Sequence, residues 1–269
     1  MIDKIPKVLT FSATDPTFGA GMQADIITLS SLGCQPLTIV TGVSVQDTIG
    51  VESLTAISEK LVNSQARTIL KDMEVSVFKC GVLGSVENIK TVAKITSDYP
   101  EIPLIIDPVL ASGRGDNFAN AEMISAMKEL LLPNTYLSTP NSNEAKKLVI
   151  QAEENLEDLS IDLCAERLKT IGCKNTLITG THENTSKVVN TFYESSGEIY
   201  PFYWDRLKGN YHGSGCTLTS AISGYLAQGL SLKTSIEKAQ YFTWQALKNA
   251  FKPGRGQYIP NRLFSSKMI

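Results

Sequence analysis

A glycine-rich turn in the last quarter of the chain carries the clearest chemical signal of this sequence. Residues 210–217 read Asn-Tyr-His-Gly-Ser-Gly-Cys-Thr and run directly into an apolar helical segment, Leu218–Leu226. The small residues Gly213, Ser214 and Gly215 let backbone N–H groups point at one spot, and the start of the helix adds partial positive charge there. We therefore predict an anion site suited to phosphate. Taken alone, the segment also fits a turn that merely caps a helix.

Cys216 lies in the first turn of the same predicted helix. The field of a helix N-terminus favours a thiolate, so we expect the pKa of this thiol to be lowered. Such a group could accept a proton from a hydroxyl as a general base. A cysteine hydrolase would instead need a histidine partner, and nothing in the sequence orients the nearby His212. A buried, unreactive cysteine is the remaining alternative.

Acidic side chains follow two of the predicted strands. The segment Asp15-Pro-Thr-Phe-Gly-Ala-Gly-Met-Gln-Ala-Asp25 comes after the first strand, and Asp107-Pro-Val109 ends a later one. Ligands of doubly wound sheets bind at the carboxyl ends of the strands. These acids are therefore expected to face a ligand crevice, although the first segment also fits an ordinary strand-to-helix turn.

Amide side chains occupy two further positions of this kind. Asn141 and Glu144 stand three residues apart at the start of a predicted helix, so they share a face and could hold hydrated Mg²⁺ near a phosphate chain. The same spacing also fits a helix N-cap with an acid at its third position. Gln46 follows the second predicted strand and matters if a ring with paired donor and acceptor edges must be bound.

Short apolar strands alternate with helical segments along most of the chain. The predicted strands are Lys7–Ser12, Leu37–Val45, Val75–Val82, Leu104–Val109, Tyr136–Thr139 and Thr176–Thr179. The predicted helices are Gly21–Leu32, Glu59–Met73, Val86–Ser97, Glu122–Leu132, one from about Ser142, Ile161–Ile171, Thr217–Gly229 and Lys233–Ala250. This alternation predicts an α/β fold with a mostly parallel, doubly wound sheet flanked by helices. Lys187–Leu207 alternates around a Ser-Ser-Gly turn and predicts a β-hairpin at the sheet edge.

Composition excludes several classes of function. The 269 residues include 25 Lys and Arg against 27 Asp and Glu, so the net charge of −2 offers no footprint for nucleic acid. No apolar run approaches the ~20 residues of a membrane span, and the first residues lack a signal-peptide pattern. Five cysteines without a C-x-x-C pair favour reduced thiols in the cytoplasm. Two histidines exclude a multi-histidine metal site, and no linker divides the single domain expected over 1–269.

Six segments together resemble the hydroxymethylpyrimidine/phosphomethylpyrimidine kinases of thiamine biosynthesis, in the ribokinase-like superfamily. The resemblance covers nearly the whole chain in one order. It rests on Asp15 to Asp25, Val43-Ser-Val-Gln46-Asp-Thr, Lys79-Cys-Gly-Val82-Leu, Asp107-Pro-Val109, Thr139-Pro-Asn141-Ser-Asn-Glu144-Ala and Gly213-Ser-Gly-Cys216-Thr. The wider superfamily usually carries Asp where this branch has Cys216, which makes that residue the sharpest discriminator.

This resemblance implies ATP- and Mg²⁺-dependent phosphorylation of 4-amino-5-hydroxymethyl-2-methylpyrimidine and then of its monophosphate, by a homodimer. It implies that Cys216 is the base or proton relay and that the backbone of Gly213, Ser214, Gly215 and Cys216 stabilises the transferring phosphoryl group. It further implies the following contacts: Gln46 to the aminopyrimidine with Ala20, Val82 and Val109 packed on it, Asp25 and Asp107 near the anion site, and Asn141, Glu144 and Thr179 at Mg-ATP.

The sequence departs from the family pattern at three places. Family members often carry Lys in a Lys-Gly-Gly-His stretch, whereas this chain has Thr179-Gly-Thr-His182, so a cationic phosphate contact is missing and Lys208 or Arg114 is a candidate to replace it. Ala13 stands where Gly is common, and Val82 replaces a larger residue. Three alternatives therefore stay open: a pyridoxal/pyridoxine kinase, a non-catalytic pyrimidine-sensing homologue, and a purely structural α/β domain.

Overall fold

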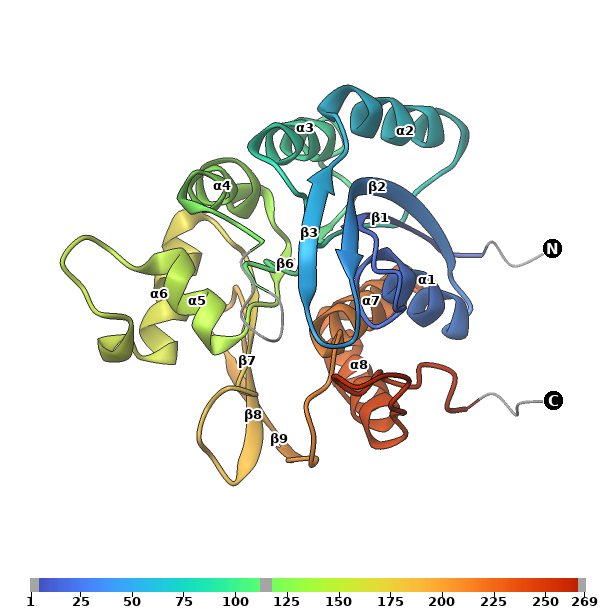
Figure 1. Cartoon of the computed structure of the whole chain (residues 1–269). Coiled ribbons are helices and arrows are strands. Elements are labelled where there is room, and N and C mark those ends of the chain that lie inside the picture. The colour runs from blue at the N-terminus through green and yellow to red at the C-terminus, as the bar shows by residue number, and fades with distance from the viewer. Residues whose placement is uncertain (1–4, 112–117, 266–269) are drawn as a thin grey trace.

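The computed structural model describes residues 5–111 and 118–265, and one nine-stranded sheet runs through them (Figure 1). The spatial order of the strands is β3-β2-β1-β4-β5-β6-β7-β8-β9. Their bounds are β1 Lys7–Ala13, β2 Gln35–Gln46, β3 Val51–Ala56, β4 Val77–Cys80, β5 Leu104–Ile106, β6 Leu137–Ser138, β7 Thr176–Thr179, β8 Lys187–Tyr193 and β9 Ile199–Asp205. The helices are α1 Gly21–Ser31, α2 Glu59–Asp72, α3 Val86–Ser97, α4 Ala121–Ala126, α5 Ser142–Val149, α6 Ile161–Ile171, α7 Ser214–Ala227 and α8 Leu232–Lys248.

The six strands from β2 to β7 in this order pair in parallel, which confirms the predicted α/β class. At one edge β8 and β9 form the predicted antiparallel hairpin. At the other edge β3 pairs antiparallel with β2, and this strand was missing from the sequence prediction. β3 contains only half-buried and exposed residues, as expected for a strand at the edge of the sheet.

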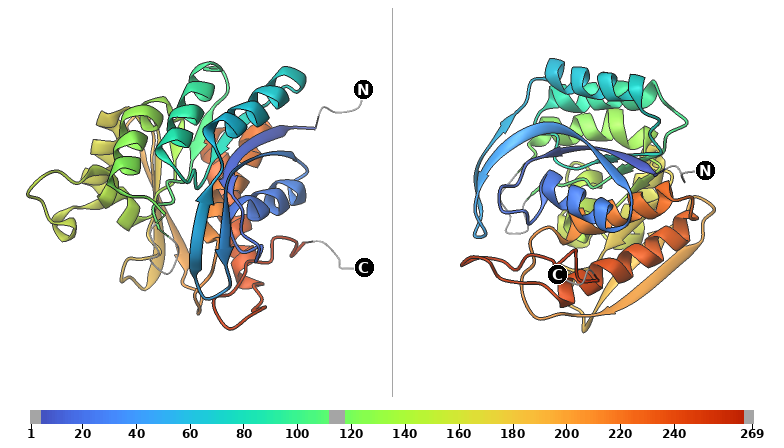
Figure 2. Two further views of the ribbon diagram at one scale, coloured as in Figure 1. Left: turned by 45° about the horizontal axis from the view of Figure 1, so that its top comes forward. Right: turned by 90° about the vertical axis from the view of Figure 1, so that its right-hand side faces the viewer.

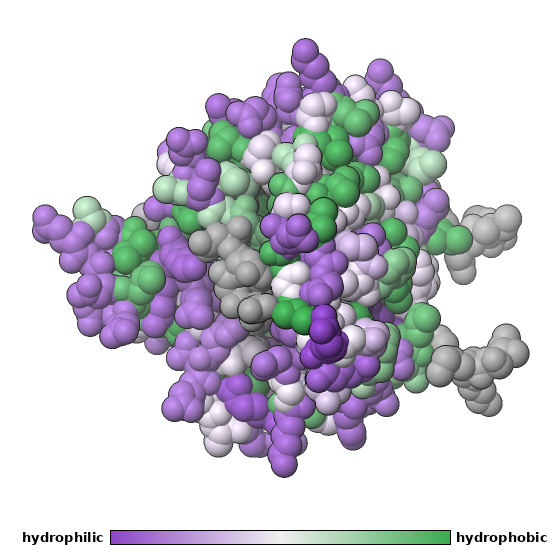
Figure 3. All heavy atoms as spheres, viewed as in Figure 1, coloured by the Kyte–Doolittle hydropathy of each residue, from purple (hydrophilic) through white to green (hydrophobic). Residues whose placement is uncertain are grey.

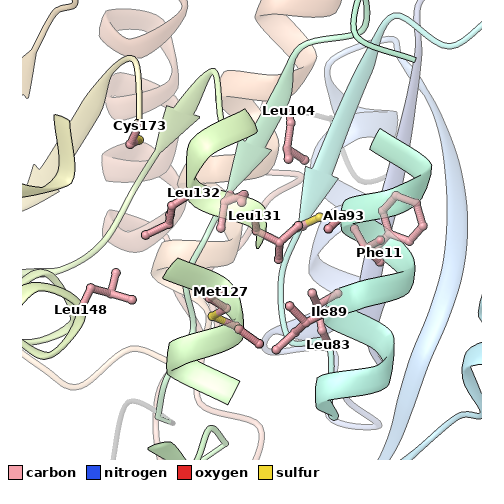
Figure 4. Packing of buried hydrophobic residues seen from close by; sticks show 14 of the residues in the cluster. Phe11, Leu83, Ile89, Ala93, Leu104, Met127, Leu131, Leu132, Leu148 and Cys173 are labelled. Carbon is pink, nitrogen blue, oxygen red and sulfur yellow. The ribbon is translucent and has the colours of Figure 1, made fainter. Parts of the chain in front are cut away.

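Helices cover both faces of the sheet (Figure 2). Apolar residues of α2 to α6 pack on one face, where Phe11, Ile89, Met127 and Leu148 belong to a single buried cluster (Figure 4). Apolar residues of α1, α7 and α8 form a second buried cluster on the other face. Burial on both faces explains why the central strands read as nearly continuous apolar runs. It also fixes where the helices begin relative to the strand ends.

Two helix boundaries differ from the sequence prediction in ways that matter for the site. α7 begins at Ser214 rather than Thr217, so the small residues of the turn already belong to the helix. The helix predicted over Glu122–Leu132 is divided into α4, a π-helical turn at Met127–Leu131 and a 3₁₀ turn at Leu132–Asn134. Pro133 lies in that last turn, where its ring and missing N–H prevent a regular α-helix from continuing.

The surface of the described residues is mixed in character. Hydrophilic side chains prevail around α5 and α6 in the view of Figure 3, whereas apolar side chains are more frequent over the upper right of that view. Within 5–111 and 118–265, no helix combines the length and the apolar character needed to cross a membrane.

Candidate active site

A cavity of about 900 Å³ opens at the carboxyl ends of the parallel strands. The last residue of β1, the last of β2 and the last of β7 all line it, as do residues just beyond β4, β5 and β6. All but one of the sequence-predicted site residues meet there, namely Ala20, Gln46, Val82, Asp107, Val109, Asn141, Glu144, Thr179, Gly213, Ser214, Gly215 and Cys216. The exception is Asp25.

The N-terminus of α7 enters this cavity without a side-chain cap. Gly213 holds the N-cap position in a left-handed conformation with φ of 79°, and no side chain within 5–111 and 118–265 caps the first turn. A Cβ atom on Gly213 would lie 1.8 Å from the Gly19 carbonyl oxygen, so only glycine fits. Because the first N–H groups of α7 lack a capping side chain, they are available to an anion in the cavity.

Cys216 lies in the first turn of α7, but the prediction of a lowered pKa was wrong. Burial raises the pKa of the Cys216 thiol to about 12, although the nearby Lys79 partly opposes this effect. Loss of hydration outweighs the field of the helix terminus. The thiol also hydrogen-bonds to the Asp107 carboxyl group, whose own pKa is raised by burial despite the charge of Lys79. At neutral pH the thiol therefore keeps its proton instead of forming a standing thiolate, and Asp107 is the neighbouring group that can accept one.

Asp25 lies near the anion site, as expected, but it does not line the cavity, so the expectation that it faces a ligand crevice is corrected. Its carboxylate is fully buried and accepts hydrogen bonds from Lys79 Nζ at 2.8 and 3.0 Å and from Ser220 Oγ at 2.7 Å. Lys79 is fully buried too, and although burial alone would lower its pKa, the Asp25 charge raises it above the usual range. This ion pair lies beside Cys216 and Asp107, where the charges of Lys79 and Asp25 act on both groups in opposite directions.

His212 is oriented by a partner that the sequence did not reveal. Its Nε2 lies 2.8 Å from Asp15 Oδ2. Burial alone would raise the pKa of Asp15, but hydrogen bonds from His212 and Thr17 hold it below the usual range, and the Gln46 side chain adds another. Asp15 Oδ2 also accepts from the Ala20 N–H at 2.6 Å. Asp15 thus fixes both Gln46 and the loop that carries Ala20.

The N-terminus of α5 is capped, in contrast to that of α7. Asn141 Oδ1 accepts from the Glu144 N–H at 3.0 Å, and Glu144 Oε2 accepts from the Asn141 N–H at 2.9 Å, which completes a capping box. The helix-cap alternative for this motif is therefore correct as local structure. Burial and the neighbouring charge of Asp107 raise the pKa of Glu144 to about 8. Glu144 and Asp107 are two neighbouring buried carboxyl groups, so a cation beside them would stabilise their ionised forms.

Comparison with known proteins decides the family. A family described as phosphomethylpyrimidine kinase matches residues 15–261. The chain belongs to this family. It is 33% identical over 266 residues to a thiamine biosynthesis bifunctional protein of Geobacter sulfurreducens, covering 97% of this chain and 53% of that protein. It is 29% identical to a hydroxymethylpyrimidine/phosphomethylpyrimidine kinase of Staphylococcus aureus, covering 94% of this chain and 92% of that protein.

The chain thus spans about half the length of the first of these relatives. Among solved structures, the pyridoxal kinase of Staphylococcus aureus in complex with AMP-PCP and pyridoxal superimposes with a TM-score of 0.87 at 26% identity, covering 98% of this chain and 96% of that one. This likeness confirms the ribokinase-like fold of a phosphomethylpyrimidine kinase family member.

The acids of the site fit a magnesium ion that keeps part of its water shell. Asp107 Oδ2 is buried and has no hydrogen-bond partner among the described residues, and Glu144 lies close enough for the Asp107 charge to raise its pKa. A cation beside these carboxyl groups would supply the missing positive charge. No group of three or more His, Cys, Asp or Glu side chains within the described ranges could hold a metal by itself. A magnesium ion held here would take its other ligands from water and phosphate oxygens.

The second end of the cavity surrounds Thr179 and differs from the sequence expectation. Thr179 bridges to Asn141 along the backbone, and its N–H donates to the Pro140 carbonyl at 2.9 Å. Lys208 is exposed and does not line the cavity, and Arg114 lies outside the described residues. Lys147, one turn beyond Glu144 on α5, lines the cavity instead.

Sequence reasoning missed three functional groups. Lys79 stands in an apolar strand and was read only as part of a ring-packing segment, although a lysine inside such a strand signals a buried partner. His212 was judged to lack an orienting group. The third, Arg262, contacts residues more than 200 positions away and left no local signal.

Proposed function

We propose that this chain transfers the γ-phosphoryl group of ATP to the hydroxymethyl group of a small aminopyrimidine, and then phosphorylates the resulting monoester. The observation that carries this proposal is the uncapped N-terminus of α7, which faces the same cavity as Cys216 and Gln46. The cavity volume suits a nucleotide together with a small ring. The names of the family and of the relatives support the substrate class.

In the first step the alcohol oxygen attacks the γ-phosphorus, and the bond to the oxygen bridging to the β-phosphorus breaks, so ADP leaves. Charge on the transferring group is stabilised by the N–H groups at the start of α7. The hydroxyl proton passes to Cys216 Sγ while the thiol proton passes to Asp107, its hydrogen-bond partner. The raised pKa of both groups favours this relay over a standing thiolate. The second acceptor is already anionic, so the relay matters less there.

Mg-ATP is proposed to lie between α7 and α5. Glu144 and Asn141 would hold magnesium partly through water, and the ion would neutralise phosphate charge. Lys147 is the proposed phosphate cation that stands in for the missing lysine at Thr179. Arg206 also lines the cavity, but its guanidinium is engaged, because it donates to the carbonyls of Thr181, Glu183 and Thr185. Lys147 has neither a hydrogen bond nor an ion pair among the described residues.

A pyridoxal/pyridoxine kinase is the second candidate, favoured by the likeness to the pyridoxal kinase structure. The two substrates present different hydrogen-bonding edges to Gln46. Because Asp15 accepts a hydrogen bond from the Gln46 side chain, the orientation of this amide is biased before any ring binds. The variant Gln46→Met replaces this amide with an apolar side chain of similar length. It should therefore weaken binding of whichever ring the protein prefers, aminopyrimidine or pyridoxine, and leave binding of the other ring unchanged.

We further propose that 1–269 forms one kinase domain that works as a homodimer in the cytoplasm. The single sheet that runs through the described residues supports one domain. Five cysteines without disulfides fit a reducing compartment. Val43 and Val45 of β2 are about half exposed, which fits a subunit contact on this edge of the sheet. Sedimentation analysis of the purified chain checks the dimer.

Product analysis tests the proposed reaction. The protein is incubated with Mg-ATP and 4-amino-5-hydroxymethyl-2-methylpyrimidine, and phosphorus NMR follows the mixture over time. The expected sequence is a monoester signal, then a diphosphate signal, with matching release of ADP. A mixture in which only pyridoxine gains a phosphate would move the function to the second candidate. Binding of the pyrimidine without any phosphate transfer would indicate a sensor.

A further inference from the structure

The C-terminal segment after α8 returns to the cavity and touches its loops one after another. The Gln257 N–H donates to the Thr48 carbonyl at 2.8 Å, just beyond Gln46. Tyr258 then pairs through its backbone with Asn210 and His212, both at 2.9 Å. This segment, the end of the described chain in red, runs below the tip of the β2–β3 hairpin in Figure 1. Arg262 follows as the deepest side chain of the segment.

Arg262 joins two loops that are far apart in sequence. Its guanidinium donates to the carbonyls of Phe18 and Gly19 on the substrate loop, at 3.0 Å for Phe18. From the same group Nε donates to Thr217 Oγ1 at 2.9 Å, and Nη2 approaches the Gly213 carbonyl at 3.4 Å. Phe18 has a φ of 62°, which is unusual for a bulky residue and needs the surrounding contacts to hold it.

The charge of Arg262 argues against a purely structural role. The side chain is only 2% exposed, and none of the described carboxylates lies within ion-pair distance of it. Burial lowers the pKa of the guanidinium to about 10, so it stays positive at neutral pH. A buried cation without an ion-pair partner is costly for folding, and an apolar residue would fill such a place at lower cost. A persistent positive charge here favours anions at the start of α7.

We propose that Arg262 is a positioning residue that locks the substrate loop Asp15–Ala20 against the anion-binding turn Gly213–Cys216. The proposal rests on the proposed kinase function, because it assigns these two segments to the two reactants. A fixed spacing of the loops sets the distance from the acceptor hydroxyl to the phosphoryl group. Arg262 lies one residue beyond the stretch that the family description matches.

Arg262→Lys tests the role, because lysine keeps the charge but cannot reach both loops with a planar fork. With hydroxymethylpyrimidine and Mg-ATP we expect kcat to fall about 10²-fold, the size typical of a small misplacement of reactants, with little change in the KM for ATP. The kcat of Arg262→Ala should fall at least as far. This variant should regain activity when free guanidinium is added at a non-denaturing concentration. Arg167→Ala is the matched control, since Arg167 binds Glu154 and the Val149 carbonyl away from the cavity.

Hydrogen exchange supplies a readout that does not depend on turnover. Peptides covering 15–21 and 210–218 should both exchange faster in Arg262→Lys and remain unchanged in Arg167→Ala. A folded Arg262→Lys protein with wild-type kcat, or slow exchange in both peptides, would overturn the proposal. If the wild type itself phosphorylates none of the acceptors, the proposed function fails, and the exchange of the two peptides alone decides whether Arg262 locks the loops. If Arg262→Ala does not fold, Arg262→Lys decides alone.

Discussion

Two helices, α7 and α5, present their N-termini to one cavity, and they begin in opposite ways. α7 starts at a left-handed glycine, and none of the described side chains caps its first turn. α5 starts at a complete capping box in which Asn141 and Glu144 satisfy each other's N–H groups. An uncapped terminus leaves donors for a ligand, whereas a capped one has used them. The N-terminus of α7 therefore suits an anion. The N-terminus of α5 instead carries the carboxyl group of Glu144.

The buried charges behind the two termini follow the same division. Arg262 lies near the start of α7 and is a cation at neutral pH, whereas the charge of the nearby Lys79 is balanced by Asp25. Glu144 and Asp107 stand at the start of α5 and after β5, and both carboxyl groups have a raised pKa. Asp107 Oδ2 would lie 3.4 Å from a Cβ atom on Gly215, so the two regions adjoin. In the proposed function, phosphate charge and a magnesium ion would lie side by side across this boundary.

The largest effect is expected at Cys216. Cys216→Ala should lower phosphorylation of the alcohol by about 10²–10⁴-fold, as is typical when a general base is removed. Phosphorylation of the monoester should fall much less, because that acceptor is already ionised. Steady-state rates with the two acceptors measure both effects. Wild-type turnover of the alcohol would remove Cys216 from the mechanism.

The open terminus is tested next by Gly213→Ala. The added Cβ would meet the Gly19 carbonyl and force the turn to move, so we expect a loss of about 10²-fold in kcat, similar to that on losing an oxyanion donor. Gly229→Ala at the other end of α7 is the control. Gly229 has a φ of 87°, and a Cβ added there would meet nothing within 4 Å, so it carries the same backbone strain without the collision. Equal losses of activity in both variants would contradict an anion site at Gly213.

The capped terminus is tested by Glu144→Gln. The single amide oxygen can still accept from the Asn141 N–H and so keep the helix cap, while the longer 3.4 Å bond from the Leu110 N–H to the other oxygen is lost. The fold should therefore survive while the charge is lost. We expect the Mg²⁺ concentration for half-maximal rate to rise about tenfold, which corresponds to ~1.4 kcal/mol. Glu157→Gln, an exposed change in a 3₁₀ turn, is the control. A magnesium titration identical to that of the wild type would take Glu144 out of the metal site.

The same residue predicts a pH dependence of stability without metal. The pKa of Glu144 is higher in the folded protein than its ordinary value of 4.5, so the native state holds a proton that the unfolded chain has lost. In EDTA the free energy of unfolding should therefore fall as pH rises from about 4.5 to about 8, by at most ~1.4 kcal/mol per pH unit for one proton. Urea midpoints of the wild type and Glu144→Gln at several pH values measure the difference. Parallel pH profiles of the two proteins would refute the raised pKa.

The smallest effect concerns Lys147. Lys147→Ala should raise the KM for ATP about fivefold, the scale of a partly exposed charge pair, and leave kcat nearly unchanged. Lys146→Ala is a matched control, because Lys146 is also half-buried on the same helix but acts on Cys164 of α6. Equal KM values in the two variants would mean that another group binds the phosphates.

The fold could be predicted from the sequence because its determinants are local. Apolar runs, helix periods and the hairpin turn each act over short distances, and only the half-exposed edge strand β3 escaped them. The cavity wall was predictable for a related reason, since the ends of parallel strands share one edge. The predictions that were wrong concern residues whose partners are distant in sequence. Asp25 points inward because it pairs with Lys79, 54 positions along the chain.

The prediction of a lowered pKa for Cys216 was wrong for a different physical reason. Position at a helix terminus is visible in the sequence, whereas the depth of burial is not, and here burial is the larger influence. His212 and Arg262 show the same limit, because Asp15 and Gly19 lie about 200 and 240 positions before them. The types of the reacting groups were readable, but the charges that tune them were not.

The proposed mechanism requires that the protein phosphorylates an aminopyrimidine alcohol with the help of the uncapped α7 N-terminus and Cys216. The decisive experiment is the initial rate of ADP release with Mg-ATP, measured in parallel for hydroxymethylpyrimidine, its monophosphate and pyridoxine, with wild type and Cys216→Ala. We predict that the wild type turns over both pyrimidines. Cys216→Ala should selectively lose the turnover of hydroxymethylpyrimidine. Turnover of pyridoxine alone, or pyrimidine turnover that survives Cys216→Ala unchanged, would contradict this mechanism.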